Sequence, residues 1–170
     1  MGPLHPLPIP DQCGDSVTMD FIGPLPEDNS NNCIVTFTDC LGSDIQLAAT
    51  CMDINAEELL TFFSDKWYCE TGLPSDIVSD RDKLFISKFW KALHKLTGVK
   101  LKMSTVYHPQ TDGASEQTNK TINQCLHYQI KQNKCGWSHA PPHMHFHMMN
   151  TINTSTGSPC SNYEWVKALN

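Results

Sequence analysis

The chain has 170 residues, 39% of them hydrophobic, and a formal net charge of −6. This length suits one domain with a substantial core, and an acidic balance is not typical of nucleic-acid-binding proteins. There is no run of about 18 apolar residues and no secretory signal pattern, so we expect no membrane span and no secretion. The eight cysteines form no C-x-x-C pair, which favours a reduced, intracellular protein.

The first predicted element is a strand over residues 16–22, after a Pro-rich lead-in. Its side chains alternate, with Val17, Met19 and Phe21 on one face and Asp20 on the other. Turn residues then separate two further strands, which are predicted at 33–39 and 44–50.

A helix is predicted next, between Asn55 as N-cap and Gly72 just past its end. Two glutamates in its first turn suit the helix dipole. Its apolar stripe consists of Leu59, Leu60, Phe63 and Trp67.

The middle of the chain predicts a strand, a helix and a strand. A short strand over 75–80 ends in Asp80, and a strand is expected over 99–104. The helix between them is predicted over 87–98, with Ser87 as its cap. Its inward side chains are expected to be Phe89, Trp90, Leu93 and Leu96.

The longest predicted helix runs from about Asp112 to Gln132, and a last helix follows Pro141 and Pro142. Strands and helices that alternate predict an α/β fold in which part of the sheet is parallel and helices pack on its faces. One polar side of the long helix carries Glu116, Asn119, Lys120 and Asn123, at spacings of three and four.

Three acids stand at informative places: Asp20 within a strand, Asp80 at a strand end and Glu116 at a helix start. Converging carboxylates suit a hard cation such as Mg²⁺, which prefers oxygen ligands. Each acid also has an ordinary interpretation, as a solvated strand residue, a turn former or a first-turn acid. Asp82 competes with Asp80 for the second position.

A histidine cluster near the end of the chain offers another metal hypothesis. His143 and His147 are four residues apart, and such a pair can bind Zn²⁺. No third ligand is evident at a useful spacing, so the Met-rich segment around His145 is better interpreted as a core helix.

Four stretches together resemble the integrase catalytic core of gypsy-class LTR retrotransposons, a retroviral-type integrase of the ribonuclease-H-like superfamily. They are "VTMDFIGPLP", "GLPSDIVSDRDKLFISKFW", "STVYHPQTDGASEQTNK" and "TSTGSP". The resemblance implies a ribonuclease-H-like fold with a five-stranded mixed sheet. It places a lead-in at 1–12, the catalytic core at 13–160 and a divergent tail at 161–170.

The resemblance also implies a catalytic triad, which falls on Asp20, Asp80 and Glu116. The interval between the last two is 116 − 80 − 1 = 35 residues, as in the family's D,D-35-E pattern. The implied activity is metal-dependent polynucleotidyl transfer, with 3′-end processing of element DNA followed by strand transfer. The triad would hold two Mg²⁺ or Mn²⁺ ions.

By the same resemblance, the nucleic-acid-binding residues are Tyr107, His108 and Gln110 in a loop and Asn119 and Lys120 on a helix. An ordinary loop and a solvated helix face are the alternatives for these positions. The implied partners are DNA, both element ends and target, with RNA as a further candidate. A homo-oligomer without a membrane partner, located inside the cell and in the nucleus, is expected.

The chain departs from the family mainly in its charge. Arg81 is its only arginine, and Gln117 and Cys40 stand where the family often has Arg, while Gly14 stands where it usually has Trp. Each lost arginine removes a phosphate contact. We therefore interpret the chain as a truncated, mutated element copy whose enzymatic activity is open. The alternatives are a catalytically idle nucleic-acid-binding remnant and a host-recruited interaction module.

Overall fold

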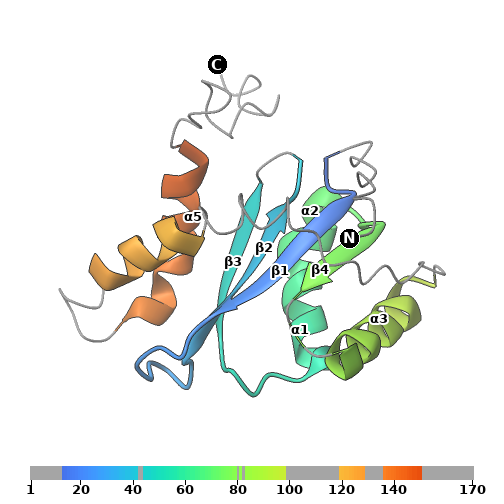
Figure 1. The fold of residues 1–170 in the computed structure, drawn as a ribbon, viewed down its shortest axis with the longest axis horizontal. Helices are drawn as coiled ribbons and strands as arrows, with labels where there is room; N and C mark the ends of the chain where they lie inside the picture. The colour runs from blue at the N-terminus through green and yellow to red at the C-terminus, as the bar shows by residue number, and fades with distance from the viewer. Residues whose placement is uncertain are drawn as a thin grey trace, which may run out of the picture.

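The structure is a computed structural model, and it contains one mixed sheet between two layers of helices (Figure 1). The predicted strand at 99–104 lies outside the described part of the chain. The residues that the structure describes are 13–41, 44–79, 81, 83–98, 119–128 and 136–150.

The described sheet has four strands in the order β3-β2-β1-β4. Strands β1 (Ser16–Ile22), β2 (Cys33–Asp39) and β3 (Ile45–Thr50) are antiparallel neighbours, whereas β4 (Asp76–Ser79) runs parallel to β1. The prediction of three antiparallel strands and a parallel part is confirmed. Five strands were expected, and the described residues form four.

The first helix begins where the sequence predicts it. Asn55 Oδ1 accepts hydrogen bonds from the backbone N–H groups of Glu57 and Glu58, at 3.0 and 2.9 Å. Glu58 Oε2 accepts in return from the Asn55 N–H at 3.3 Å, which completes a capping box. The helical run comprises α1 (Ala56–Phe63), a π-helical segment η1 (Ser64–Tyr68) and α2 (Cys69–Thr71).

Helix α3 (Lys83–Thr97) corrects two predictions. It begins four residues before Ser87, because the burial of Ile86 and the packing of Phe85 on the core outweigh the capping signal of a serine. Leu96 is 56% exposed rather than inward. The residue four positions after the buried Leu93, on the same helical face, is Thr97 and not Leu96. The Thr97 hydroxyl donates to the Leu93 carbonyl at 2.9 Å.

Helices α1 and α3 cover one side of the sheet (Figure 1). Their core contains a chain of edge-to-face rings, in which Phe63 contacts Phe37 and Phe89 with centroids 5.4 and 5.5 Å apart. Val17 and Met19 of β1 are fully buried in this cluster and Phe21 packs against it, as the alternation predicts.

The opposite side of the sheet is covered by a helical stretch over 119–128, a short 3₁₀ turn η2 (Trp137–His139) and α5 (Pro141–Asn150) (Figure 1). Ile122 and Leu126 are the buried positions of 119–128, and they pack in the core on this side of the sheet. No helix in the described ranges is both long and apolar enough to cross a membrane.

Gly14 stands where integrase cores of this type usually have a tryptophan, by the resemblance noted above. The backbone conformation at Gly14 explains why a side chain does not fit there. It is buried, with a positive φ of 84°, which L-residues rarely adopt. A Cβ atom there would lie 2.5 Å from Thr71 Cγ2. The entry into β1 therefore requires glycine in this chain.

Candidate functional site

The candidate site starts at Asp20, near the end of β1. Asp20 is partly buried and lies on the opposite face from Met19 and Phe21. The parallel ladder to β4 pairs Met19 with Ser79. These two residues directly precede Asp20 and Asp80 in the sequence, so two of the three predicted acids each follow a member of the same cross-strand pair.

Asn119 reaches Asp20 from the helical stretch at 119–128. Its Nδ2 donates to Asp20 Oδ2 at 3.3 Å, across 99 positions of sequence. The amide must point this way, because its oxygen would face a negatively charged acceptor in the reverse orientation. The bond orients the Asp20 carboxylate and ties the helix to the sheet.

The donor atoms around Asp20 suit a hard divalent cation. Asn119 Oδ1 is buried and has no hydrogen-bond partner among the described residues, and a carboxylate lies on the other side of the same amide. Carboxylate and amide oxygens are ligands that Mg²⁺ accepts. In the described part of the chain, however, no three or more His, Cys, Asp or Glu side chains are grouped to hold a metal, and that part includes His143, His145 and His147.

Beside Asp20 lies an open groove of about 530 Å³. One wall is the segment from Phe21 to Pro26, and the other is the 119–128 helix. Trp137 Nε1 donates to the Pro26 carbonyl at 2.7 Å, which supports the first wall from behind. The helix contributes Asn119, Asn123 and His127, at steps of four residues. Local sequence patterns do not predict this groove, since its walls come from segments that are distant in the chain.

The first groove wall is also held by Asp28. Its two carboxylate oxygens accept from the backbone N–H groups of Gly136 and Ser138, at 3.0 and 2.9 Å. Hydrogen bonds to Ser138 and Gly136 lower the pKa of Asp28 below its ordinary value. The connection after β1 is thereby joined to the turn that precedes α5.

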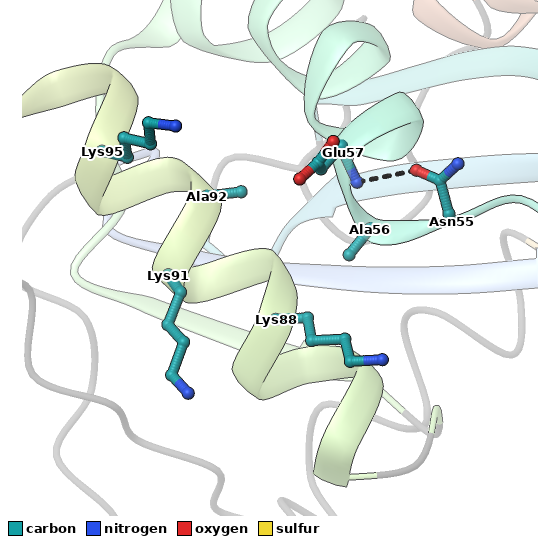
Figure 2. Close-up of a pocket in the computed structure, with 7 residues that line it drawn as sticks. All are labelled: Asn55, Ala56, Glu57, Lys88, Lys91, Ala92 and Lys95. Carbon is teal, nitrogen blue, oxygen red and sulfur yellow. Dashed lines mark hydrogen bonds between the residues drawn. The ribbon is translucent and has the colours of Figure 1, made fainter.

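A second depression, of about 390 Å³, lies between the start of α1 and α3 (Figure 2). Lys88, Lys91 and Lys95 line its α3 side, and Glu57 points toward them from α1 (Figure 2). The lysines are exposed and the carboxylate partly balances their charge. Because α3 and 119–128 pack on opposite sides of the sheet, this depression is separate from the groove at Asp20.

Some of the predicted site residues belong to the described part of the chain, and others lie outside it. Asp20 and Asn119 are in direct contact, and Lys120 is exposed on the same helical stretch. Gln117, where the resemblance suggested a lost arginine, lies outside the described residues. Cys40 lies within them, and its backbone N–H donates to the Ser16 carbonyl at the start of β1, away from Asp20. Also outside the described residues lie Asp80, Asp82, Glu116, Tyr107, His108 and Gln110.

Comparison with known proteins connects this geometry to a family. No family model matches the chain. The Transposon Tf2-3 polyprotein of Schizosaccharomyces pombe (strain 972 / ATCC 24843) is 36% identical over 126 residues, which cover 74% of this chain and 9% of that polyprotein.

Solved structures agree in fold. The HTLV-2 integrase catalytic core domain, in its trimeric form with magnesium, matches with a TM-score of 0.65 at 15% identity, over 86% of this chain and 93% of that one. A chain of the simian T-cell lymphotropic virus intasome in complex with the PP2A regulatory subunit B56 gamma matches with a TM-score of 0.68 at 14% identity, over 86% of this chain and 52% of that one. The chain is an integrase core domain of the LTR-retrotransposon type.

The integrase core has the expected ribonuclease-H-like fold, with its mixed sheet and its helices on both faces. It spans about 9% of the polyprotein that it matches. At 14 to 15% identity the solved structures establish the fold alone.

Proposed function

We propose that this integrase core performs metal-dependent polynucleotidyl transfer on DNA, by 3′-end processing and strand transfer. Its ligands for two Mg²⁺ or Mn²⁺ ions are Asp20, Asp80 and Glu116. The observation that carries the proposal is the parallel pairing of Met19 with Ser79, one residue before each aspartate. The contact from Asn119 adds a third element, three positions after Glu116 in sequence.

Each part of the groove has a role in this proposal. Asn119 donates a hydrogen bond to one oxygen of the Asp20 carboxylate and so orients that carboxylate within the site. The wall from Phe21 to Pro26 offers apolar surface to sugars and bases, and Asn123 and His127 offer donors to phosphates from the other wall. Lys120 adds an exposed ammonium group on the same helix. Bound divalent ions would activate the attacking oxygen and stabilise the leaving one.

The proposed partners follow from this chemistry. Element ends and target DNA are the substrates, RNA is a further candidate for the same groove, and the nucleus is the proposed place of action. Oligomers are a feature of related cores, such as the trimeric form of the HTLV-2 domain. We extend the homo-oligomer to this chain as part of the proposal.

A second candidate function is a catalytically idle nucleic-acid-binding remnant. The observation in its favour is charge: the chain carries −6, and the side chain of its one arginine packs between two phenylalanine rings. Phosphate contacts must then come from lysine, which cannot make the bidentate contact of arginine. In both candidates DNA lies in the groove beside Asp20, and only the first has metal-dependent cleavage.

Cleavage and binding assays separate the two candidates. A labelled branched DNA that reports the disintegration reaction should be converted in Mn²⁺ by the wild type and not by Asp20→Asn or Asp80→Asn. Asp82→Asn should retain activity. DNA binding without any conversion, unchanged by all three substitutions, would favour the idle remnant.

The location of DNA is tested by a pair of matched lysine variants. Lys120→Gln and Lys91→Gln each remove one exposed helical lysine, the first from the helix that lines the Asp20 groove and the second from the α3 depression. We expect Lys120→Gln to reduce the slope of log affinity against log salt concentration by about 1 and Lys91→Gln to leave it unchanged. The opposite result would place DNA on α3.

A further inference from the structure

Arg81, the only arginine of the chain, is held between two aromatic rings. Its guanidinium carbon lies 4.1 Å from the ring centroid of Phe21 and 5.1 Å from that of Phe85. The two rings meet edge-on, with their centroids 6.5 Å apart. A cation over aromatic faces at these distances is attracted to both rings.

Hydrogen bonds from the guanidinium and from the backbone of Arg81 hold the same residue. Arg81 Nη2 donates to the carbonyl of Met52 at 3.0 Å, and the Arg81 backbone N–H donates to Ser79 Oγ at 3.3 Å. Met52 is held in turn, because its N–H donates to Asn32 Oδ1 at 2.8 Å. One residue therefore joins β1, the segment after β3, the end of β4 and α3.

The position of this clamp relates it to the predicted acids. Phe21 follows Asp20 directly, and Arg81 follows Asp80 directly. The β1–β4 ladder pairs Met19 with Ser79. The Arg81–Phe21 contact therefore joins the two segments one residue beyond each acid. A change in this contact would alter the spacing of the two segments that carry Asp20 and Asp80.

We propose that Arg81 is a positioning residue for the metal centre, which sets the distance between the Asp20 and Asp80 segments through Phe21, Phe85 and the Met52 carbonyl. The inference rests on the proposed function. It assigns the one arginine to the geometry of the acids and not to DNA phosphates. Lysine cannot replace it, because a single ammonium cannot contact two rings and a carbonyl with the planar geometry of a guanidinium.

The test measures Mn²⁺ binding by calorimetry in the absence of DNA. Arg81→Lys should weaken Mn²⁺ binding about 10-fold, as is typical when a group that orients metal ligands is lost, and Arg81→Met should weaken it more, since it removes more of the clamp. Phe85→Leu keeps the arginine but removes one ring, and should give an intermediate loss. The salt dependence of DNA binding should be unchanged in Arg81→Lys and Arg81→Met.

Two controls separate positioning from charge and from general stability. Lys91→Met removes a positive charge from the exposed face of α3 and should bind Mn²⁺ as the wild type does. Leu59→Ala opens a cavity in the same core cluster, so it should lower the melting temperature without changing Mn²⁺ affinity. If Arg81→Met does not fold, Arg81→Lys and Phe85→Leu still decide.

The outcomes distinguish this inference from the proposed function. Wild-type Mn²⁺ affinity in Arg81→Lys and Phe85→Leu, with normal binding by the wild type, overturns the inference alone. A salt slope reduced by about 1 in Arg81→Met, without a change in Mn²⁺ affinity, would assign Arg81 to DNA. A wild type that binds no Mn²⁺ overturns both.

Discussion

Replacing Asn119 with aspartate tests whether this side chain belongs to the acidic site. Asn119 Nδ2 lies 3.3 Å from Asp20 Oδ2, so the variant exchanges a donor for a second carboxylate. Two unit charges at that distance repel by about 5 kcal/mol at an effective dielectric constant of about 20. Protonation of one carboxyl limits the cost at pH 7 to about 4 kcal/mol. Because Asp20 is partly exposed, we expect solvent screening to leave a loss of about 2 kcal/mol.

The loss in Asn119→Asp should have a definite pH dependence. Repulsion raises the pKa of one carboxyl of the pair above its unfolded value of about 3.9. The folded state then binds more protons than the unfolded state between that value and the raised pKa, so stability returns as pH falls through the raised pKa. Urea unfolding at pH 7 and pH 5, relative to the wild type, measures the difference. Mn²⁺ at pH 7 should also restore stability, since a cation offsets the repulsion.

The matched control is Asn123→Asp, which adds the same charge one turn along the helix. Asn123 is exposed and lines the same groove. We expect its stability to stay within about 0.5 kcal/mol of the wild type at both pH values. Equal stability of Asn119→Asp and the wild type at pH 7, or the same pH dependence in both variants, would refute the assigned contact.

Three further predictions concern the scaffold. Asn55→Ala should lower the free energy of unfolding by about 1 kcal/mol and Asn55→Asp should not, because only alanine lacks the capping oxygen; urea titration compares them. The lowered pKa of Asp28 means that this carboxylate stabilises the folded state above its unfolded pKa of 3.8, and that the stabilisation is lost as pH falls through the folded pKa. The free energies of unfolding of Asp28→Asn and the wild type should therefore differ at pH 6 and converge in strong acid. Gly14→Ala should lower the free energy of unfolding by more than about 1 kcal/mol, because alanine is strained at this positive φ. Adding Thr71→Ala to that variant should recover only the part of the stability that is lost through the close Cβ contact, as thermal melts would show.

Local patterns predicted much of the scaffold. The alternation in β1 places Met19 and Phe21 against one core and leaves Asp20 on the other face, and the capping box at Asn55 starts α1 as expected. These features depend on neighbours within a few residues, which a sequence displays directly. The start of α3 and the exposure of Leu96 were predicted wrongly, since both depend on what packs against the helix.

The contacts within the candidate site could not be predicted in the same way. The Asn119–Asp20 hydrogen bond joins residues 99 positions apart, and sequence spacing placed Asn119 only on the polar side of a helix. Arg81 was conspicuous as a lone arginine, but its clamp needs Phe21, Met52 and Phe85 from three other segments. The family resemblance identified which acids matter, and the tertiary structure shows what holds Asp20.

The location of bound metal tests the account most directly. Crystals grown with Mn²⁺ can be measured at a wavelength where manganese scatters anomalously. We predict two manganese peaks about 3.5–4 Å apart, both within ligand distance of the carboxylates of Asp20, Asp80 and Glu116. A saturated crystal with no peak beside Asp20, or with manganese bound only at the histidines of α5, would contradict the two-metal site.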